Sequence, residues 1–562
     1  MVKPLSLSIT SWIIILFSLP SLYGQNSELQ LSILDLTTGL ETPARVEIKD
    51  KANNFYIAED ALPAGGDCDM SDIGAQLTDL ESALPLFNKE IFNPYFNSIQ
   101  FYSDGSSFIS ELPDTIYLTI MKGSEYQIAM DTLFLKSGSV SNHTIRLERW
   151  VNMREDQWYS SDLHLHIPRP TEELNPYISK MMQAEDIHVG NLLQSGKVKN
   201  FKMAEQYAFG KRSVYEENGY LLAAGQENPR THVFGHTITL GSEVPVFNEE
   251  KYLVYRLIWE QTTTHGGLNG FAHAWQDEPD GPSPQNGMAL VLPHDLMHFI
   301  EVLQFNRAGY NAWYDVLNLG FEVAPTAGSD YPCADQSIPG HERFYTHVSG
   351  EFNYENWLES IELGKTFVTT GPVLQFTIND QQLGSKLELT NRDSITISGM
   401  VKFDPHADNI KFLEIVNNGQ VIKKISRTDH SDSLVFKFKH HIEHTGWFAL
   451  RGYGDKRFEN VFNQPIHFNF LKASTNFHSA PIYVNVAGSK NPETKRVAHA
   501  YLARIHDIRN QLDLRNLEYL ADQIMNPFDG VPREVLIKSR TSLLKELEHA
   551  EGYFEDLILG RE

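Results

Sequence analysis

Apolar and polar residues alternate with a period of two through much of residues 25–150. The stretch LQLSILDLTTGLETPARVEIKD alternates on both sides of a Gly/Pro turn, and FYSDGSSFISELPDTIYLTIMKGSEYQ alternates around Asp104-Gly105 and Pro113-Asp114. Because successive side chains of a strand face opposite sides, this pattern is typical of strands with one face on a core. We therefore expect residues 25–150 to form a small antiparallel β-sandwich.

The pattern changes over residues 151–372, where short apolar strands alternate with helical stretches. YLLAAGQE and NGFAHAW are strand-like, whereas EELNPYISKMMQAED and EKYLVYRLIWEQTTTHG are helical in pattern. Alternating strands and helices favour an α/β architecture with a largely parallel sheet. We expect this region to be an α/β domain.

Residues 373–487 return to a strand pattern, and residues 488–562 turn helical. SITISGMVKF, FLEIVNNGQVIKKI and WFALRGYG belong to the first of these regions, and Asn417-Asn418-Gly419 is a hairpin signal. After residue 490, apolar residues recur at spacings of three and four, which is the helical repeat. We expect a second β-sandwich and then a helical C-terminal segment.

Residues 1–24 have the composition of a secretory signal peptide. Lys3 supplies a positive start, an apolar run covers residues 12–19, and Gly24 is a small residue before a cleavage point. We expect an exported protein, periplasmic or extracellular, without stable membrane insertion after cleavage. An uncleaved membrane anchor is the alternative.

The amino-acid composition excludes several classes of function and favours another. The 562 residues include 47 Lys and Arg against 72 Asp and Glu, a formal charge of −25. This charge argues against a general nucleic-acid-binding protein, which needs a basic surface. Two cysteines, Cys68 and Cys333, cannot build a disulfide scaffold or a thiolate zinc cluster, and whether they pair stays open. The 22 histidines point instead to imidazole ligands for a metal ion.

The clearest candidate for chemistry is SDLHLHIPRP, residues 161–170. On a strand, Asp162, His164 and His166 point to the same side, so two imidazoles can reach one metal ion. A helix would need a spacing of four, as in His-Glu-x-x-His. The alternative is a pair of surface histidines on an ordinary strand. Asp162 is either a partner that orients a ligating imidazole or a solvent-facing acid.

Acidic and imidazole side chains also lie at the ends of other expected strands. Glu227 ends YLLAAGQE and His236 follows in HVFGHTITL, a gap that suits a strand, a turn and a return strand. His273 lies in NGFAHAWQ, and Asp330 lies beside small residues in PTAGSDYP. A single buried histidine is usually a satisfied core residue. Ligand-type side chains at several strand ends are instead typical of barrel enzymes, which collect their sites there.

Two further residues are candidates for the reaction itself. Glu301 in FIEVLQF is a candidate general base, or a carboxylate at the edge of the core. Arg343 in HERFYTHV is a candidate for binding an anionic substrate group, and Arg169 just after the histidine pair is comparable. A structural role is the alternative for all three.

The order of the motifs DLHLH, GQENP, FGH, GFAHA, VLQF, AGSDYP and LGKTFVTTGPVLQFTIND resembles the carbaryl-hydrolase-like (CehA/McbA) metallohydrolases of the PHP superfamily. The resemblance covers about residues 150–385. It implies a distorted (β/α)7 barrel with a cluster of two or three metal ions. Residues 25–150 are similar to carboxypeptidase-regulatory-like modules, which support or present a neighbouring domain.

The resemblance also implies a role for each matched residue. His164 and His166 correspond to the first metal pair, Glu227 to an acidic ligand that can bridge, His236 and His273 to ligands of the second metal, and Asp330 to the closing aspartate.

The sequence departs from the general PHP pattern in two places. Asp330 is followed by Tyr331 and Pro332, so the usual Asp-x-His is incomplete. AEDIHVGNLLQSGKVKN stands where Thr-Asp-His is usual. The residues there that could substitute, although none matches the pattern, are Glu185, Asp186, His188 and Lys197. One or two divalent ions are therefore expected rather than three.

The types of ligand indicate which metal ions the site would bind and which reaction it would support. Four imidazoles and two carboxylates without a thiolate suit Zn, Mn or Fe. A bound divalent ion lowers the pKa of water toward about 7 and supplies hydroxide at neutral pH. We expect an exported metal-dependent hydrolase acting on an ester, carbamate or amide bond of a small molecule. The alternatives are a PHP-type phosphoesterase on the same scaffold and a non-catalytic binding protein with a degraded metal site.

Overall fold

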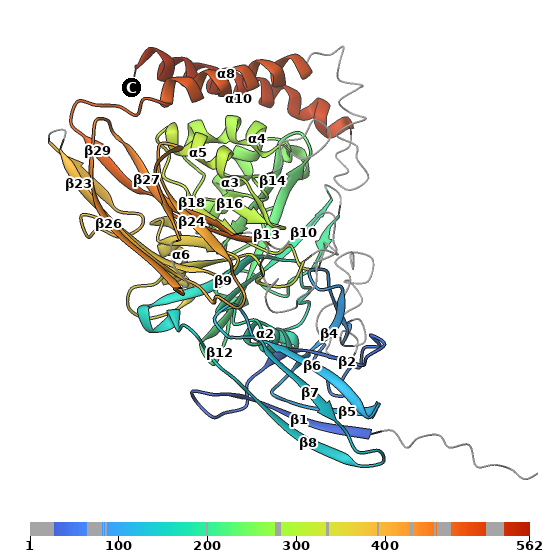
Figure 1. Ribbon diagram of the computed structural model, residues 1–562. Coiled ribbons are helices and arrows are strands. Elements are labelled where there is room, and N and C mark those ends of the chain that lie inside the picture. The colour runs from blue at the N-terminus through green and yellow to red at the C-terminus, as the bar shows by residue number, and fades with distance from the viewer. Residues whose placement is uncertain are drawn as a thin grey trace, which may run out of the picture.

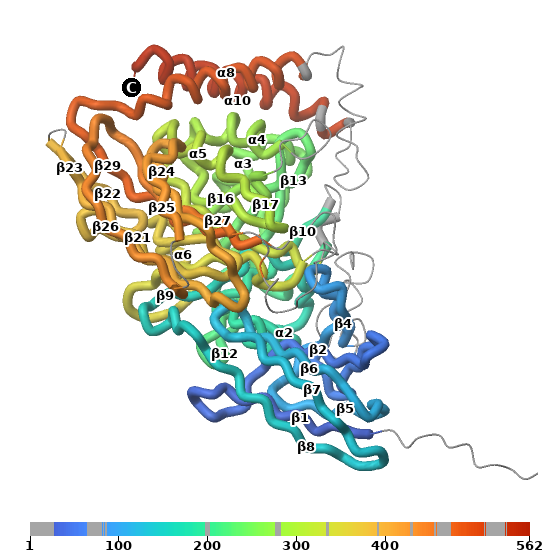
Figure 2. Tube along the Cα trace, in the orientation of Figure 1, coloured from blue at the N-terminus to red at the C-terminus, as the bar shows by residue number. Residues whose placement is uncertain are grey.

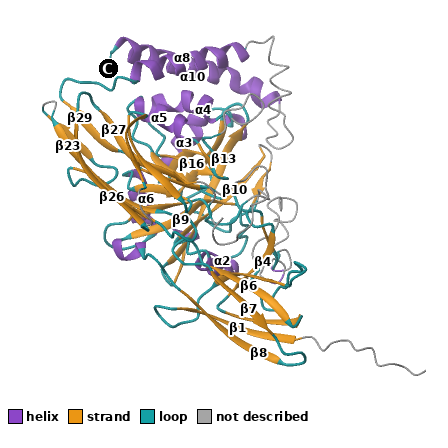
Figure 3. Ribbon diagram, viewed as in Figure 1, coloured by secondary structure: helices purple, strands orange, loops and turns teal. Residues whose placement is uncertain are grey.

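The computed structural model of the protein describes residues 27–63, 87–197, 200–275, 283–332, 337–390, 393–427, 431–454, 474–512 and 533–561, with Glu81, Leu84 and Arg457. The chain is built mostly from strands in several sheets (Figure 3). Strands β1–β8 lie at one end of the molecule and helices α8 and α10 at the other (Figure 1). The expected signal peptide, Cys68 and Cys333 lie outside the described residues. In the part of the chain that is described, no helix is long and apolar enough to cross a membrane.

Two sheets form the first region, with strand orders β5-β1-β8 and β3-β4-β2-β6-β7. The strands are β1 Ser27–Asp35, β2 Ala44–Lys49, β3 Ile91–Asn93, β4 Ser98–Ser103, β5 Ser106–Leu112, β6 Thr115–Met121, β7 Ala129–Phe134 and β8 Val140–Leu147. As the period of two predicts, alternate residues of β1 are buried, and Leu29, Leu31 and Ile33 lie in the core.

The pairing in this region differs from the expected antiparallel sandwich in two ways. Strands β1 and β8 are parallel. The Asp104-Gly105 turn does not close a hairpin, because β4 pairs with β2 whereas β5 pairs with β1 in the other sheet. A short turn can therefore pass the chain between two sheets as well as between neighbouring strands.

Within the described residues, the central region contains strands β9 to β20 and five α-helices. Its strands are β9 Trp158–Leu165, β10 Val189–Lys197, β11 Asn200–Met203, β12 Tyr215–Glu217, β13 Tyr220–Thr231, β14 Gly235–Leu240, β15 Leu268–Phe271, β16 Phe299–Gln304, β17 Arg307–Ala308, β18 Ala324–Ala327, β19 Arg343–His347 and β20 Thr366–Thr369. Its helices are α2 Asn175–Ala184, α3 Tyr255–Thr264, α4 Pro284–Val291, α5 Tyr310–Asn318 and α6 Tyr354–Glu362.

The central sheet is mixed rather than largely parallel. Strands β9, β10 and β13 are parallel neighbours, as are β15, β16 and β18, but β14 runs antiparallel between β13 and β15. Only residues 232–234 separate β13 from β14, which is too short for a parallel crossover. The return strand expected between Glu227 and His236 is confirmed, and it interrupts the regular β/α alternation.

The two outer strands of this series, β9 and β18, meet at their carboxyl ends. Leu165 and Tyr331 form a parallel bridge, and the Asp330 N–H donates to the His164 carbonyl at 2.8 Å. The His166 N–H donates in turn to the Tyr331 carbonyl at 2.7 Å. These contacts bring the segment around Asp330 against the histidine pair.

The third region shares a sheet with the central one, since β20 pairs with β28. Its strands are β21 Val373–Ile378, β22 Lys386–Leu389, β23 Ser394–Lys402, β24 Ile410–Asn417, β25 Gln420–Ser426, β26 Ser433–His441, β27 Gly446–Gly454, β28 Thr475–Ser479 and β29 Ile482–Val486. Strands β21, β23 and β26 form a separate sheet. The expected hairpin at Asn418 and Gly419, both at positive φ, is confirmed.

Helices α8 Thr494–Gln511 and α10 Arg533–Leu559 lie side by side beyond α4 and α5 (Figure 2). Tyr501, Ile505 and Leu547 are buried in the same core cluster as Met288 of α4. The C-terminal sequence with the helical repeat thus forms two helices, and these cover the end of the molecule opposite β1–β8.

Candidate metal centre

His164 and His166 lie together at the carboxyl end of β9, and both are fully buried. The period of two turns the rings to the same side, and their Nε2 atoms lie 3.1 Å apart. His166 Nδ1 lies 3.0 Å from the Leu193 carbonyl, which can only accept, so Nδ1 donates and Nε2 keeps its lone pair. His164 Nδ1 lies 3.2 Å from both carboxylate oxygens of Glu301. In each ring, Nδ1 is engaged and Nε2 is the nitrogen available to a metal ion.

Glu227 is the centre of the cluster and is 2% exposed. Its Oε2 lies 3.3 Å from His166 Nε2, whereas its Oε1 lies 2.8 Å from His236 Nδ1 and 3.6 Å from His273 Nε2. Two buried groups, one with His164 and His166 and one with His236 and His273, therefore share this carboxylate. In each group the ligand atoms lie within 4.8 Å of one another, close enough to hold a metal ion.

Asp330, on the segment that follows β18, completes the first group. Its Oδ1 lies 3.3 Å from His166 Nε2 and 3.5 Å from His164 Nε2. The structure brings all six predicted metal ligands into one cluster: His164, His166, Glu227, His236, His273 and Asp330.

Local backbone geometry explains how these residues approach so closely. A Cβ atom on Gly328 would lie 2.5 Å from the His164 Cβ, so only glycine lets this segment pack against β9. Asp330 and His273 both adopt positive φ, 59° and 35°, which is unfavourable for residues with a Cβ. Strain of this kind costs about 1–3 kcal/mol per residue and is concentrated at functional sites.

Burial and neighbouring charge act in opposite directions on the ligands. Burial lowers the pKa of His273 to about 3, so that ring stays neutral and able to ligate. Burial alone would raise the pKa of Glu227, but Arg230 and His236 hold it well below its usual range, so this carboxylate stays ionised. Burial raises the pKa of Asp330, and the imidazoles of His164 and His166 only partly offset this.

Glu301 lies behind His164 rather than among the ligand atoms. Its carboxylate faces His164 Nδ1 and accepts the His273 N–H at 2.8 Å. Burial raises the pKa of Glu301 well above its usual range, because the charged form is desolvated. Its position therefore favours orienting two ligands, and its expected role as a general base stays a prediction.

The carboxylate of Asp162 accepts backbone N–H groups and not the N–H of an imidazole ring. It does not face solvent either. It is fully buried, and its carboxylate accepts the backbone N–H groups of His164, Ser329 and Gly340 at 2.9–3.1 Å. Asp162 thus ties β9 to the segment that carries Asp330. Burial raises its pKa to about 6.

Arg343 lies away from the ligand cluster. Its guanidinium donates to the carbonyls of Gly340, Glu185 and Asp186 at 2.6–3.3 Å. Arg169 is also fully buried and donates to Gln206 and Asn175. In the described part of the chain, the contacts of these two arginines connect loops and strand ends, and none reaches a metal ligand.

Two of the residues considered as substitutes for the missing Thr-Asp-His instead join the first region to the central one. Glu185 accepts Arg45 Nε at 2.7 Å, and Asp186 binds Arg149 at 2.9 Å. Their carboxylates pair with arginines of the first region. The number of metal ions stays a prediction.

Arg230 is a site residue that the sequence did not single out. Its Nη1 lies 3.1 Å from Glu227 Oε2 and 2.9 Å from Ser195 Oγ, and Ser195 Oγ also donates to Glu227 at 3.2 Å. A basic residue three positions after a ligand is a weak signal on its own. A bulge in the β13–β14 pairing between Glu227 and Arg230 turns both side chains toward the cluster.

No family model matches the chain, and no curated protein matches it. Among solved structures, it is similar to a two-domain protein containing a predicted PHP-like metal-dependent phosphoesterase from Bacteroides vulgatus. The similarity has 12% identity, covers 58% of this chain and 94% of that chain, and has a TM-score of 0.31. At this TM-score the likeness does not establish a common fold, and membership of the CehA/McbA family stays a prediction.

Proposed function

We propose that the protein is an exported metal-dependent hydrolase of the PHP type that acts on an ester, carbamate or amide bond of a small molecule. The observation that carries the proposal is the pair of buried His/Glu groups sharing Glu227. Buried His and Glu side chains from separate strands meet there. Packing of a core does not require such a cluster of polar groups, whereas a functional site does.

The donor set fits a divalent cation. The cluster holds the carboxylates of Glu227, Glu301 and Asp330. Arg230 pairs with Glu227. Burial raises the pKa of Glu301 and Asp330, and a bound cation would favour their ionised forms. Buried excess charge is costly unless an opposite charge compensates it. Imidazole and carboxylate ligands without a thiolate suit Zn, Mn or Fe. His164, His166, Glu227 and Asp330 would hold one ion, and Glu227, His236 and His273 a second.

When bound, such an ion lowers the pKa of a water molecule and stabilises the negative charge that develops on the substrate. The chain itself holds the ligands in place. Arg230 and Ser195 fix Glu227, the Leu193 carbonyl fixes the His166 ring, and Glu301 holds His164. The Asp330 side chain is 20% exposed, more than the other ligands, so we expect substrate to approach on its side.

A phosphoester is the second candidate bond. Arg230 favours it, because a guanidinium at the ligand cluster suits the two anionic oxygens of a phosphoryl group.

The test combines metal content with turnover. The full chain would be loaded with Zn or Mn, and bound metal measured by elemental analysis in wild type, His166→Ala and His265→Ala. His265 is an exposed residue at the end of α3 and serves as a matched control. The same samples would be assayed on carboxylic esters, carbamates, amides and phosphodiesters.

We expect one or two ions per wild-type chain, at least a tenfold weaker affinity in His166→Ala, and wild-type behaviour in His265→Ala. Turnover should fall with the metal by two orders of magnitude or more. A wild-type chain without bound metal, or turnover that does not depend on His166, would contradict the proposal. Turnover of phosphodiesters alone would favour the second candidate.

A further inference from the structure

The short hairpin of β16 and β17 carries an arginine beside the candidate metal centre. Gln304 and Arg307 pair across a turn of two residues. The Gln304 side-chain amide lies 3.4 Å from His164 Nδ1, so the turn begins next to a candidate ligand. Residues paired across a hairpin have Cα atoms about 5 Å apart. The backbone of Arg307 is therefore one strand spacing away from a residue that touches the centre.

The backbone of this turn is strained. Both of its residues lie in the left-handed region, Phe305 at a φ of 50° and Asn306 at 55°. Two successive positive φ values are typical of a type I′ turn, where asparagine and glycine are favoured. A bulky side chain such as Phe is a clear exception there. Strain of this kind is concentrated at functional sites, so the turn is a place to look for a function.

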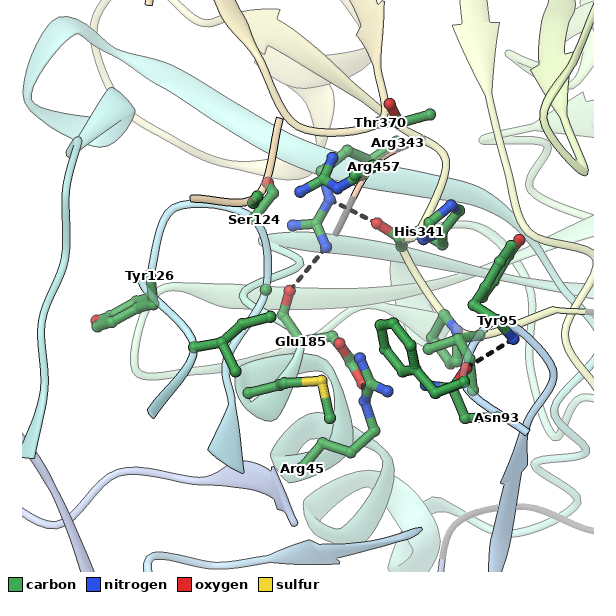
Figure 4. Close-up of a pocket in the computed structure, with 18 of the residues that line it drawn as sticks. Arg45, Asn93, Tyr95, Ser124, Tyr126, Glu185, His341, Arg343, Thr370 and Arg457 are labelled. Carbon is green, nitrogen blue, oxygen red and sulfur yellow. Dashed lines mark hydrogen bonds and ion pairs between the residues drawn. The ribbon is translucent and has the colours of Figure 1, made fainter. Parts of the chain in front are cut away.

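Buried groups behind the turn hold it in place. The Asn306 N–H donates to the Glu342 carboxylate at 2.8 Å, and the Tyr95 hydroxyl donates to the same oxygen at 3.4 Å. Glu342 is fully buried, and the Tyr95 ring stacks on His341 with centroids 3.8 Å apart (Figure 4). The position of the turn is therefore set by the interior of the protein.

Arg307 lies over the indole ring of Trp275. Its guanidinium carbon is 4.4 Å from the ring centre, and the Phe305 ring meets the same indole edge-on at 6.4 Å. Trp275 comes two residues after the candidate ligand His273. A Cβ on Gly309 would lie 2.5 Å from the Trp275 backbone nitrogen, so glycine is needed for this close approach. The guanidinium is thus held beyond the carboxyl ends of β15 and β16, the end at which the candidate ligands lie.

The charge of Arg307 is available to a ligand. Its side chain is exposed, and among the described residues no carboxylate forms an ion pair with it. The chain has 72 acidic against 47 basic residues, so an exposed arginine would readily meet a carboxylate of its own chain. Stacking on a ring engages the face of a guanidinium and leaves the N–H donors at its edge. That edge binds a carboxylate or phosphate through two parallel N–H···O bonds.

We propose that Arg307 is a specificity-determining residue that binds a negatively charged group of the substrate, away from the bond that is cleaved. The substrate is then a small ester, carbamate or amide that also carries a carboxylate or a phosphate. Its apolar part would lie against the half-buried rings of Trp275 and Phe305. Phe305 packs against the core cluster that contains Tyr331, the neighbour of Asp330, where we expect substrate to approach. The proposal rests on the proposed function, because the metal centre supplies the cleavage.

The experiment measures binding of small acids to the full chain loaded with Zn, by calorimetry in dilute buffer, because salt screens exposed charges. The dicarboxylates succinate, glutarate and adipate are compared with butyrate, valerate and hexanoate, which have the same carbon chains but a single carboxylate. One carboxylate can reach the metal ion and the second can reach Arg307. In 3-phosphonopropionate, a phosphonate replaces one carboxylate of succinate.

The variants are Arg307→Gln, which removes the charge, and Trp275→Leu, which removes the ring beneath it. Arg146→Gln is the matched control, because Arg146 is an exposed arginine of β8 at the far end of the molecule. Bound metal is measured in every sample.

We expect at least one dicarboxylate to bind wild type and Arg146→Gln at least tenfold more tightly than the matching monocarboxylate. Arg307→Gln should lose this gain while keeping the metal content and the monocarboxylate affinity of wild type, and Trp275→Leu should reduce the gain. A larger Arg307-dependent gain for 3-phosphonopropionate than for succinate would identify phosphate as the preferred group, and a smaller one would identify carboxylate.

Two results would overturn the proposal while the chain still binds metal, and both would leave the proposed function standing. The first is no gain from a second carboxylate in wild type, which is the behaviour of a guanidinium already neutralised within the chain. The second is an equal gain in wild type and Arg307→Gln. A wild-type chain that binds no metal would contradict the proposed function and, with it, this proposal.

Discussion

At the scale of single residues, the positions of the carboxylates decide what each one does. Glu227 has both oxygens among the imidazoles. Glu301 instead contacts the far nitrogen of His164, the His273 backbone N–H and the Gln304 side-chain amide. Outer partners of this kind fix the tautomer and orientation of a ligating ring, and their loss typically weakens metal binding by 10–100-fold. Glu301 is therefore a positioning residue in this arrangement.

Replacing Glu301 with glutamine tests this role. Glu301→Gln keeps the shape of the side chain but offers a weaker acceptor to His164 Nδ1, so we expect metal affinity to fall by about tenfold or more. The fold should persist, because an uncharged amide is cheaper to bury than a carboxylate. Metal affinity would be measured by chelator competition, with circular dichroism to check folding.

Glu322→Gln, at an exposed carboxylate that pairs with Lys386, is the matched control and should bind metal as wild type does. Equal metal affinity in Glu301→Gln and wild type would show that Glu301 does not position His164.

At the scale of elements, one carboxylate fastens the C-terminal helices to the central region. Glu546 of α10 accepts Arg256 of α3 at 2.9 Å and His294 at 3.1 Å. Although burial would raise its pKa, hydrogen bonds from His294 and Arg256 lower the pKa of Glu546 to about 2. The interaction thus favours the charged form of Glu546 in the folded state.

This pKa fixes the pH range over which Glu546 stabilises the protein. A carboxyl whose pKa is lower when folded stabilises above its unfolded pKa of about 4.3 and loses that effect as pH falls toward 2. Glu546→Gln should therefore lower the melting temperature at pH 7, and the difference from wild type should shrink between pH 4.3 and pH 2. Scanning calorimetry over this range measures it.

Glu548→Gln on the same helix removes an exposed carboxylate and should leave the melting temperature within a degree or two of wild type. A Glu546→Gln difference that stays constant down to pH 2 would show that the ion pairs do not fasten α10.

At the scale of the whole molecule, a buried charge network joins the first region to the central one. Arg149 Nη1 lies 2.5 Å from Glu125 and 2.9 Å from Asp186, and Tyr220 donates to Asp186 at 2.7 Å. The Asp186 side chain is fully buried. Breaking a buried ion pair from one side is costly, because it leaves the other charge without compensation.

Arg149→Met tests how strongly this network holds the regions together. It leaves Glu125 and Asp186 buried without their guanidinium, so we expect the free energy of unfolding to fall by about 3 kcal/mol or more. Urea unfolding followed by circular dichroism measures the change. Lys211→Met, which breaks the exposed Lys211–Glu355 pair, should change it by less than about 1 kcal/mol. A similar loss of unfolding free energy in both variants would show that the buried network stabilises the fold no more than an exposed ion pair does.

Much of the candidate site could be predicted because its signals are local. The strand period alone places His164 and His166 on one side, and the short gap between Glu227 and His236 predicts a return strand. Arg230 and the true contacts of Asp162 were missed, because they depend on a bulge and on backbone N–H groups from distant segments.

The sequence by itself determined which residues form strands and helices and which side chains have ligand chemistry, because these depend on residue type and short-range period. Tertiary structure alone decided that Asp104-Gly105 passes the chain between sheets and that Arg343 binds main-chain carbonyls rather than lying among the metal ligands. Partners hundreds of residues apart meet only when strands pair and sheets close. The energy of a buried charge then depends on those neighbours rather than on its own place in the sequence.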